Sequence, residues 1–424
     1  MNKNFCYAPF VHMYLHDKYD RKLCCVSEDP YDTKKSIPDD LDEYWTSDFY
    51  QLIRKKMLDN QHVDNCIPCY NREAVGEVSE RDRYTMMFEN RNIEVDFMQG
   101  NQYKTPLDFE LRPGNLCNLK CRMCEPNSSS QLDKEYRYNK ELFRSVYNKK
   151  RLLPSDDTYI NIDDKNIEYI LKNAEHINQI KLLGGEPTIM SQTIEILERL
   201  IDRNVLDITM HVTTNCTNAN EKFLELIQYF NNVCYNFSID GTSKTLEYIR
   251  YPIHFNKLTE NMQVLCKGVQ NNNAQILYTL QAYNLPNVID FLKWVVEMHD
   301  ILQNNKDLPN NLGLLVSDLI GPEWASIQSL PIDVRNNWLD IALNNEILNH
   351  FSNSHEEIID SEFKLIESNI KDVLTRLRND MTQHSMEPLI DITKRFDIVR
   401  KQHIKDFIPE IWEIMDHAYY YKDR

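Results

Sequence analysis

The amino-acid sequence predicts an α/β protein whose centre is a partial (β/α)6 TIM barrel. From about residue 106 to 316, short apolar runs typical of strands alternate with segments of helical pattern, as in a parallel sheet. The apolar residues of the intervening segments recur at three- and four-residue spacing, so each segment has a single apolar helical face. Together these two observations favour a barrel built from strand–helix units.

Six strands are expected, a number that suits a partial barrel. They are predicted over residues 107–111, 180–183, 208–213, 233–239, 276–280 and 312–316. The helices between them are expected to cover the outside of the sheet. Their apolar faces lie within residues 167–174, 223–230, 258–269 and 288–296.

Two regions of different character flank this predicted barrel. The first contains five cysteines and one clear helix, in which Phe49, Ile53 and Met57 repeat every fourth position. The second has no cysteine, and its helices are indicated by Ile358, Phe363, Leu365, Ile366, Ile408, Ile411 and Ile414. We therefore predict an N-terminal cysteine-rich module at 1–100, a barrel core at 101–320 and a C-terminal helical extension at 321–424.

Composition restricts the partners and the compartment. The chain has 48 Lys and Arg against 65 Asp and Glu, and a formal net charge of −17 disfavours polyanions such as nucleic acid. No apolar run of about 18 residues suits a membrane span, and the N-terminus lacks the apolar core of a secretory signal. We expect a cytoplasmic protein, in which 11 cysteines serve metals, chemistry or packing rather than disulfides.

Three cysteines lie in one loop directly after the first predicted barrel strand. Cys117, Cys121 and Cys124 follow the spacing C-x3-C-x2-C. A cubane 4Fe-4S cluster normally takes four cysteines, so three ligands leave one iron open to another molecule. Loops at the C-terminal ends of barrel strands are also where active sites lie. Half of a zinc knuckle is the alternative, although zinc sites favour a second pair of ligands, and none follows Cys124 at short range.

The segment CNLKCRMC resembles the signature of the radical S-adenosylmethionine (SAM) superfamily in both spacing and position. The resemblance implies that the three cysteines hold a 4Fe-4S cluster that binds SAM and cleaves it reductively to a 5′-deoxyadenosyl radical. That radical would abstract hydrogen from an unidentified substrate, in a peptide modification or a small-molecule oxidation. An electron donor such as flavodoxin or ferredoxin is implied as a partner.

Further residues are implied to bind SAM. Gly184, Gly185, Glu186 and Pro187 resemble the family's GGEP segment, which binds the methionine amino group; glycine permits close backbone approach, and a carboxylate accepts hydrogen bonds from an ammonium. The ribose, the methionine carboxylate and the adenine would be contacted by Met123, Thr214, Asn215, Ser238, Asp240 and Arg250. The alternative is structural: GGEP as a tight turn, short polar side chains as helix caps and Arg250 as a solvated charge.

The N-terminal cysteines resemble the auxiliary-cluster modules called twitch or SPASM, although here the module precedes the barrel. The resemblance implies a second 4Fe-4S cluster that holds substrate or accepts an electron, with ligands Cys6, Cys24, Cys66 and Cys69. Spacing does not choose between Cys24 and Cys25, and Cys24 is favoured by resemblance. Zinc at the same four thiols stays an alternative. The cysteines at 216, 234 and 266 are expected to be small buried hydrophobic residues.

Two other functions compete with the radical SAM interpretation. One is a zinc-stabilised binding protein, and the other is an iron–sulfur electron carrier without SAM turnover. A visible spectrum separates the first, because zinc has a filled d shell and absorbs no visible light. Production of 5′-deoxyadenosine under reducing conditions separates the second.

Overall fold

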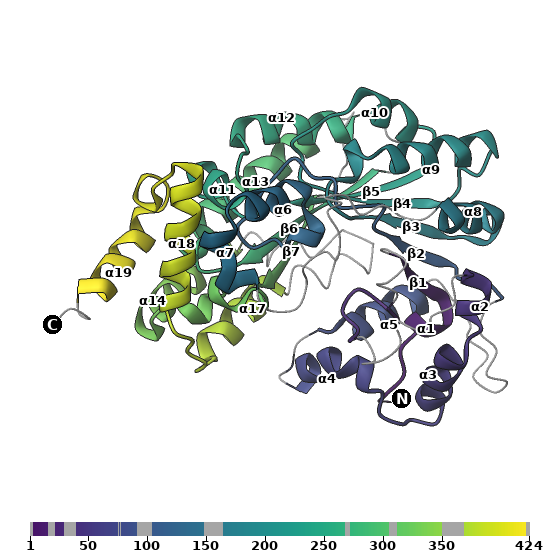
Figure 1. The fold of residues 1–424 in the computed structure, drawn as a ribbon, viewed down its shortest axis with the longest axis horizontal. Coiled ribbons are helices and arrows are strands. Elements are labelled where there is room, and N and C mark those ends of the chain that lie inside the picture. The colour runs from purple at the N-terminus through teal and green to yellow at the C-terminus, as the bar shows by residue number, and fades with distance from the viewer. Residues whose placement is uncertain are drawn as a thin grey trace. The chain divides into compact units, whose positions relative to one another are not determined.

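A computed structural model describes residues 3–15, 22–28, 40–74, 76, 78–90, 104–147, 164–267, 272–304, 312–349 and 369–420. Its strands form a seven-stranded sheet in the order β1 to β7, and Figure 1 labels the elements. The chain folds as two compact units. Unit 1 comprises Met1–Asn115, Tyr159–Thr213 and Asn220–Cys234, and unit 2 comprises Leu116–Thr158, Thr214–Ala219 and Tyr235–Arg424.

All six predicted strands are present, with ends shifted by a few residues. They are β2 (Asp108–Leu111), β3 (Gln179–Leu182), β4 (Thr209–Thr214), β5 (Asn232–Ser238), β6 (Asn272–Leu280) and β7 (Leu312–Asp318). The expectation of six strands was wrong by one, because β1 (His12–Leu15) lies within the cysteine-rich N-terminal region. It directly follows the helix α1 (Ala8–Val11), so no turn signal separated it from its neighbour in the sequence.

Unit 1 contains strands β1 to β4, which pair in parallel with a continuous register. His12 lies opposite Asp108, Asp108 opposite Gln179, and Gln179 opposite Thr209. Every residue of β1 and β2 is buried, as expected for strands covered on both faces. β2 nevertheless alternates Asp108 and Glu110 with Phe109 and Leu111, so one face of this buried strand is acidic.

The helices of unit 1 bury apolar stripes and carry local capping signals. In α3 the buried side chains include Tyr50, Ile53 and Met57, which confirms the predicted helix. Asn220 is the N-cap residue of α10, and its side-chain oxygen accepts a hydrogen bond of 3.0 Å from the amide of Phe223. The helices are α1 (Ala8–Val11), α2 (Leu41–Trp45), α3 (Asp48–Leu58), α4 (Ile67–Ala74), α5 (Glu80–Asn90), α8 (Asp164–Lys172), α9 (Ser191–Asp202) and α10 (Glu221–Ile227).

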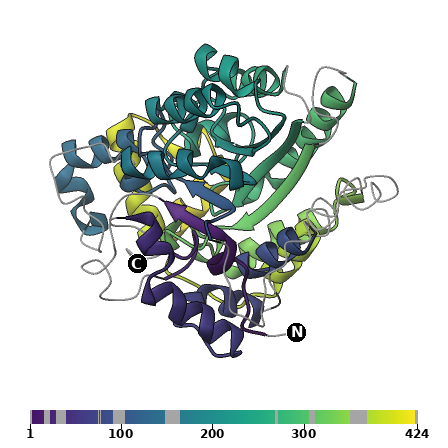
Figure 2. The ribbon, with the colours of Figure 1, turned by 90° about the vertical axis from the view of Figure 1, so that its right-hand side faces the viewer.

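Unit 2 contains the parallel pair β6 and β7, which lie side by side as the long green strands of Figure 2. β5 crosses the boundary between the units. The loop with the three cysteines also belongs to unit 2 and leads into α6 (Ser130–Tyr138) and α7 (Lys140–Tyr147). The remaining helices of the barrel region are α11 (Ser243–Ile249), α12 (Phe255–Cys266) and α13 (Val288–Gln303).

The described residues after β7 are mainly helical. α17 packs against both β7 and α14, so this part of the chain contacts the sheet directly. The helices are α14 (Ile332–Leu343), α17 (Asn369–Asn379), α18 (Glu387–Arg400) and α19 (Pro409–Tyr420). Ile408, Ile411 and Ile414 lie at or within α19, whereas the other predicted apolar positions, at 358, 363, 365 and 366, lie outside the described residues. None of the described helices has the length and apolar character needed to cross a bilayer.

Candidate functional site

The three-cysteine loop is fixed through its backbone to the end of α11. The amide of Lys120 donates to the carbonyl of Tyr251 at 2.7 Å, and the amide of Arg122 donates to the carbonyl of Ile249 at 2.8 Å. Cys117 and Cys121 are buried, and Cys124 is partly buried. The loop therefore holds its thiols on a backbone whose polar groups are satisfied by a neighbouring segment.

The three thiols lie close enough to influence one another. Burial raises the pKa of Cys124, and Cys121 and Cys117 raise it further. Burial also raises the pKa of Cys121, while Arg250 and Arg400 lower it. A buried thiol stays protonated unless a metal or a cation stabilises the thiolate. The donor set therefore fits an iron–sulfur cluster, next to two arginines that each also pair with a carboxylate.

Two of the predicted SAM-binding residues lie beside this loop. The side-chain amide of Asn215 donates to Oδ1 of Asn118 at 3.1 Å and to Sγ of Cys117 at 3.8 Å. Nε of Arg250 donates to Oδ2 of Asp240 at 2.6 Å, and the pair is largely buried. Arg250 is therefore a fixed, charge-paired residue near Cys121, and not the solvated helix charge of the alternative interpretation.

Thr214, Ser238 and Met123 are the other residues of unit 2 that the sequence predicted to bind SAM. Oγ1 of Thr214 accepts a hydrogen bond of 3.1 Å from the amide of Cys216, a local turn contact of the kind that the structural alternative requires. Ser238 ends β5 and is half-buried. Met123 is half-buried between Arg122 and Cys124. The roles of Thr214, Ser238 and Met123 in SAM binding stay predictions.

Arg122 is a site residue that the sequence did not reveal. It lies next to Cys121, is fully buried and stacks with its guanidinium carbon 3.6 Å from the ring centroid of Tyr248. Nη2 donates to Oδ1 of Asp397 at 2.7 Å and to the side chain of Gln402 at 3.1 Å. Asp397 is on α18, so a helix 275 residues further along the chain supports the cysteine loop. No local pattern could have indicated this pairing.

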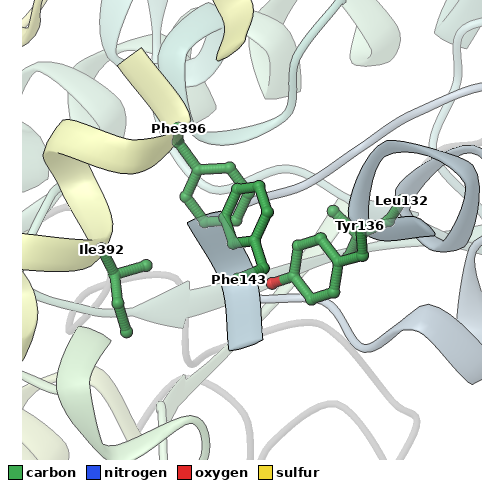
Figure 3. Packing of buried hydrophobic residues seen from close by; sticks show 5 residues of the cluster. All are labelled: Leu132, Tyr136, Phe143, Ile392 and Phe396. Carbon is green, nitrogen blue, oxygen red and sulfur yellow. The ribbon is translucent and has the colours of Figure 1, made fainter. Parts of the chain in front are cut away.

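An apolar cluster adds to the support from α18. In Figure 3, Ile392 and Phe396 project from α18 toward the α6–α7 region, where Leu132, Tyr136 and Phe143 lie. The rings of Tyr136 and Phe143 stack with centroids 4.5 Å apart, and Phe143 and Phe396 are 5.1 Å apart. Cys124 packs against the same cluster. The third cysteine thus lies against a hydrophobic surface made partly by the C-terminal helices.

The Gly-Gly-Glu-Pro segment lies in unit 1 and makes close contacts with Arg112–Gly114. Gly184 has a φ of +111°, and a Cβ atom there would lie 2.6 Å from the carbonyl oxygen of Gly114. The amide of Gly185 donates to that same oxygen at 3.0 Å. Glycine is therefore required at position 184, both for backbone conformation and for space. The segment is tied to Gly114, which precedes Cys117 in the chain by three positions.

Glu186 is fully buried and caps the turn that follows it. Its Oε1 accepts a hydrogen bond of 2.7 Å from Oγ1 of Thr188 and one of 3.3 Å from the amide of that residue. Pro187 begins this turn (Pro187–Ile189). These contacts are those of the structural alternative, and the predicted contact of Glu186 with an ammonium remains a prediction. The Glu186 carboxylate has room for Thr188 and for an ammonium at the same time, because a carboxylate has about four acceptor positions.

Four N-terminal thiols influence one another in unit 1. Burial raises the pKa of Cys6 strongly, and Cys66, Cys24 and Cys69 affect it too. Burial also raises the pKa of Cys24 and of Cys66, each to about 12. These are the four cysteines predicted as auxiliary ligands, and a set of four thiols fits either a cubane cluster or zinc. Among the described residues, no group of three or more His, Cys, Asp or Glu side chains is arranged to hold a single metal ion.

Cys25 has different neighbours from Cys24. Burial raises the pKa of Cys25, Glu110 and Glu80 raise it further, and Arg112 lowers it. Cys24, in contrast, is influenced by Cys69 and Cys66. Of the two consecutive cysteines, Cys24 is the one whose pKa Cys66 and Cys69 raise, whereas Cys25 is affected by Glu110, Glu80 and Cys24.

A buried polar network in unit 1 was also missed by sequence reasoning. Nδ1 of His12 lies 2.9 Å from Oδ2 of Asp108, and its Nε2 lies 3.1 Å from the hydroxyl of Tyr84. Nζ of Lys181 lies 3.5 Å from the same Asp108 oxygen. Burial raises the pKa of Asp108, but Lys181 and His12 outweigh it and hold the pKa below its usual range. The polar alternation within β2 could have indicated this network.

The comparisons with known proteins agree with the motifs. Residues 111–295 match the family model described as Radical SAM superfamily, a range that contains the cysteine loop and all predicted SAM-binding residues. A search of the curated proteins found no match.

Several solved structures are similar at low identity. Streptococcus suis SuiB bound to S-adenosylmethionine is 15% identical, over 76% of this chain and 66% of that chain, with a TM-score of 0.36. Native anSMEcpe with bound AdoMet and Cp18Cys peptide is 19% identical, over 58% and 62%, with a TM-score of 0.38. The chain spans slightly less than two thirds of both. Because these TM-scores are low, the family match carries the finding: residues 111–295, rather less than half of the chain, match a radical SAM superfamily domain, which supports an enzyme of unspecified reaction.

Proposed function

We propose that this enzyme binds a 4Fe-4S cluster through Cys117, Cys121 and Cys124 and cleaves SAM reductively at its open iron. The observation that carries the proposal is the group of three mutually influencing thiols, held in a buried loop within the matched range. When bound, such a cluster supplies the single electron that splits the sulfonium into methionine and a 5′-deoxyadenosyl radical. The substrate is a peptide to be modified or a small molecule to be oxidised.

The residues around the loop would position SAM and exclude water. Asn215, close to Cys117, and Arg250, close to Cys121, can bind polar groups of the nucleoside or the methionine carboxylate. Gly184 and Gly185 expose backbone next to Gly114, and Glu186 can accept a hydrogen bond from the methionine ammonium. Thr214, Ser238, Asp240 and Met123 complete the proposed set.

We further propose that Cys6, Cys24, Cys66 and Cys69 hold an auxiliary 4Fe-4S cluster, as in twitch or SPASM modules. The support is the mutual influence of these four thiols, together with the different set of charged neighbours that shifts the pKa of Cys25. With all four irons bound to cysteine, the cluster would accept the electron left after hydrogen abstraction rather than bind substrate directly. Zinc is the alternative occupant, and a visible spectrum of the protein without the loop cluster separates the two.

The test is anaerobic reconstitution with iron and sulfide, followed by reduction with dithionite in the presence of SAM. We expect 5′-deoxyadenosine and methionine in equal amounts from the wild type and none from Cys121→Ala. Cys266→Ala is the matched control, because Cys266 is also buried in unit 2 but lies on α12. A fully iron-loaded wild type that forms no 5′-deoxyadenosine overturns the proposal.

A further inference from the structure

A groove lies between two of the C-terminal helices of unit 2, α14 and α19, which Figure 1 labels. Its volume is about 440 Å³. Both helices lie outside residues 111–295, so the radical SAM domain does not account for this groove. We call it the α14–α19 groove, and its lining includes Asp333, Val334, Trp338, Glu410, Glu413 and Ile414.

The floor of the α14–α19 groove is apolar. Val334 and Trp338 lie one turn apart on α14, Ile414 lies on α19, and all three side chains are half-buried. Ile341 follows Trp338 by three positions on the same side of α14 and is 48% exposed, so the apolar stripe continues beyond the groove. An apolar side chain of a partner that lies here would remove further apolar surface from water, which favours binding.

The rim of the groove is acidic and has no cation of its own. Asp333, Glu410 and Glu413 are exposed, and the groove is lined by no lysine or arginine among the described residues. The ion pairs of the described residues include none of these three carboxylates. Other exposed carboxylates of unit 2 do have a basic neighbour, as in the pair of Glu260 with Lys257. The rim therefore offers negative charge to a partner from outside the chain.

Helix geometry explains two of the rim carboxylates but not the third. Asp333 and Glu410 lie in the first turns of α14 and α19, where a negative charge interacts favourably with the helix N-terminus. Glu413 lies one turn further along α19, beside the same apolar floor. In the described part of the chain, no three acidic, histidine or cysteine side chains are arranged to hold one metal ion. A partner that presents several separate cations fits this groove better than a single metal ion.

We propose that the α14–α19 groove is the docking surface for a basic peptide segment, which presents lysine or arginine to the rim and an apolar side chain to the floor. The rim supplies charge complementarity, which mainly accelerates the encounter of two partners. The indole of Trp338 supplies apolar area and a ring face that attracts lysine or arginine. The inference does not depend on SAM cleavage, because its residues lie outside the matched domain.

The test measures the fluorescence anisotropy of a labelled peptide that repeats lysine, leucine, lysine and alanine. The variant is Glu410→Lys/Glu413→Lys. A net charge of −17 attracts basic peptides to the whole surface, so a matched control is needed. Glu297→Lys/Asp300→Lys changes the charge of unit 2 equally, at two exposed carboxylates with the same spacing on α13. We expect wild type and control to bind the peptide with similar affinity, and the variant to bind it roughly tenfold more weakly.

A second pair of variants decides the question if the charge reversal prevents folding. Asp333→Asn/Glu413→Gln keeps the shape of both side chains and should weaken binding severalfold, whereas Glu297→Gln/Asp300→Asn should not. Trp338→Ala tests the floor. It should weaken binding of the leucine-containing peptide more than binding of a peptide in which serine replaces leucine and alanine, because only the first peptide can fill the floor.

Equal weakening by the groove variants and their α13 controls overturns the docking surface, since it shows attraction by net charge alone. Unchanged binding in Asp333→Asn/Glu413→Gln overturns it as well, and so does an equal effect of Trp338→Ala on the two peptides. Formation of 5′-deoxyadenosine with dithionite should stay at the wild-type level in all of these variants. If the wild type forms none, the proposed function fails, and the peptide measurements still test the groove.

Discussion

The two cysteine groups of this protein differ in how they are held and in what surrounds them. The three loop cysteines lie within eight consecutive positions, and the four N-terminal ones are spread over positions 6 to 69. Charges of both signs act on each group. Arg250 and Arg400 lower the pKa of Cys121, which burial and Asp240 raise, and Arg81 lowers the pKa of Cys66, which burial, Cys69 and Glu73 raise.

This difference indicates a division of tasks between the two groups. Three thiolates leave an iron open, and nearby cations favour the negatively charged state of a reduced cluster. Four thiolates would close the coordination of a cluster and leave no iron open. On this comparison we propose the loop as the site of SAM cleavage and the N-terminal group as a site that only transfers electrons.

The largest expected effect comes from removing one ligand at each group. Cys121→Ala should abolish formation of 5′-deoxyadenosine, because the open-iron cluster is lost. Cys69→Ala should keep dithionite-driven cleavage of SAM while iron falls from about eight to about four per chain, since each cubane holds four. Iron analysis and product chromatography check both. Equal loss of 5′-deoxyadenosine in the two variants contradicts the division of tasks.

The next effect distinguishes Cys24 from Cys25. In a background with Cys117, Cys121 and Cys124 replaced by alanine, only the N-terminal group can bind a cluster. There, Cys24→Ala should lose the remaining visible absorbance and about four irons, and Cys25→Ala should keep them. The reason is that Cys66 and Cys69 raise the pKa of Cys24, whereas Glu110 and Glu80 are the largest charged influences on Cys25. Loss of iron in Cys25→Ala with retention in Cys24→Ala reverses the assignment.

The support of the loop by α18 provides the third test. Asp397→Asn removes the charge that Arg122 contacts at 2.7 Å in a largely buried position. We expect a loss of roughly 2–4 kcal/mol of unfolding free energy, as for a buried pair that loses one partner, together with weaker iron retention at the loop. Asp391→Asn, on the same helix, removes a more exposed pair with Arg395 and should cost less than about 1 kcal/mol. Denaturant unfolding of the unloaded protein checks both.

The sequence predicted those features of the molecule whose signals lie within a short stretch of the chain. The six predicted strands and the helix containing Ile53 were found because hydrophobic alternation is a local property. The cysteine loop was found because its spacing is local as well. β1 is no shorter than β2 or β3, but it lies outside the region of alternating strand and helix patterns, and its pairing partner β2 lies 96 positions away.

The parts that the sequence did not reveal depend on contacts between distant segments. Arg122 has no special pattern of its own, and its role is visible only when Asp397 and Tyr248 surround it. The choice between adjacent Cys24 and Cys25 depends on which way each side chain points, and spacing carries no information on that. Glu186 was predicted as an ammonium acceptor, and the structure adds that it caps its own turn.

The fourth test compares two glycines of unit 1 that share a positive φ. Gly184→Ala places a Cβ 2.6 Å from the Gly114 oxygen, whereas Gly76→Ala meets nothing within 4 Å. Both should lose about 1–2 kcal/mol of stability from left-handed strain. Only Gly184→Ala should also weaken SAM binding, by roughly tenfold, which corresponds to about 1.4 kcal/mol. Isothermal titration with SAM measures this, and unchanged affinity contradicts the role of the GGEP segment.

The smallest effect concerns acid stability in the unit that holds the N-terminal group. The pKa of Asp108 is held below its usual range by Lys181 and His12, against the effect of burial. The folded state therefore binds this proton less readily than the unfolded state, so the stabilisation is complete above about pH 4 and declines below it. One proton contributes at most about 1.4 kcal/mol per pH unit.

Asp108→Asn should flatten the stability of the protein against pH below about pH 4, and Asp42→Asn, at the exposed pair with Lys172, should leave the profile unchanged. Urea unfolding at a series of pH values measures both slopes. A steep acid limb retained in Asp108→Asn would locate the sensitive carboxylates elsewhere. The His12–Asp108 pair would then contribute little to the stability of the protein against acid.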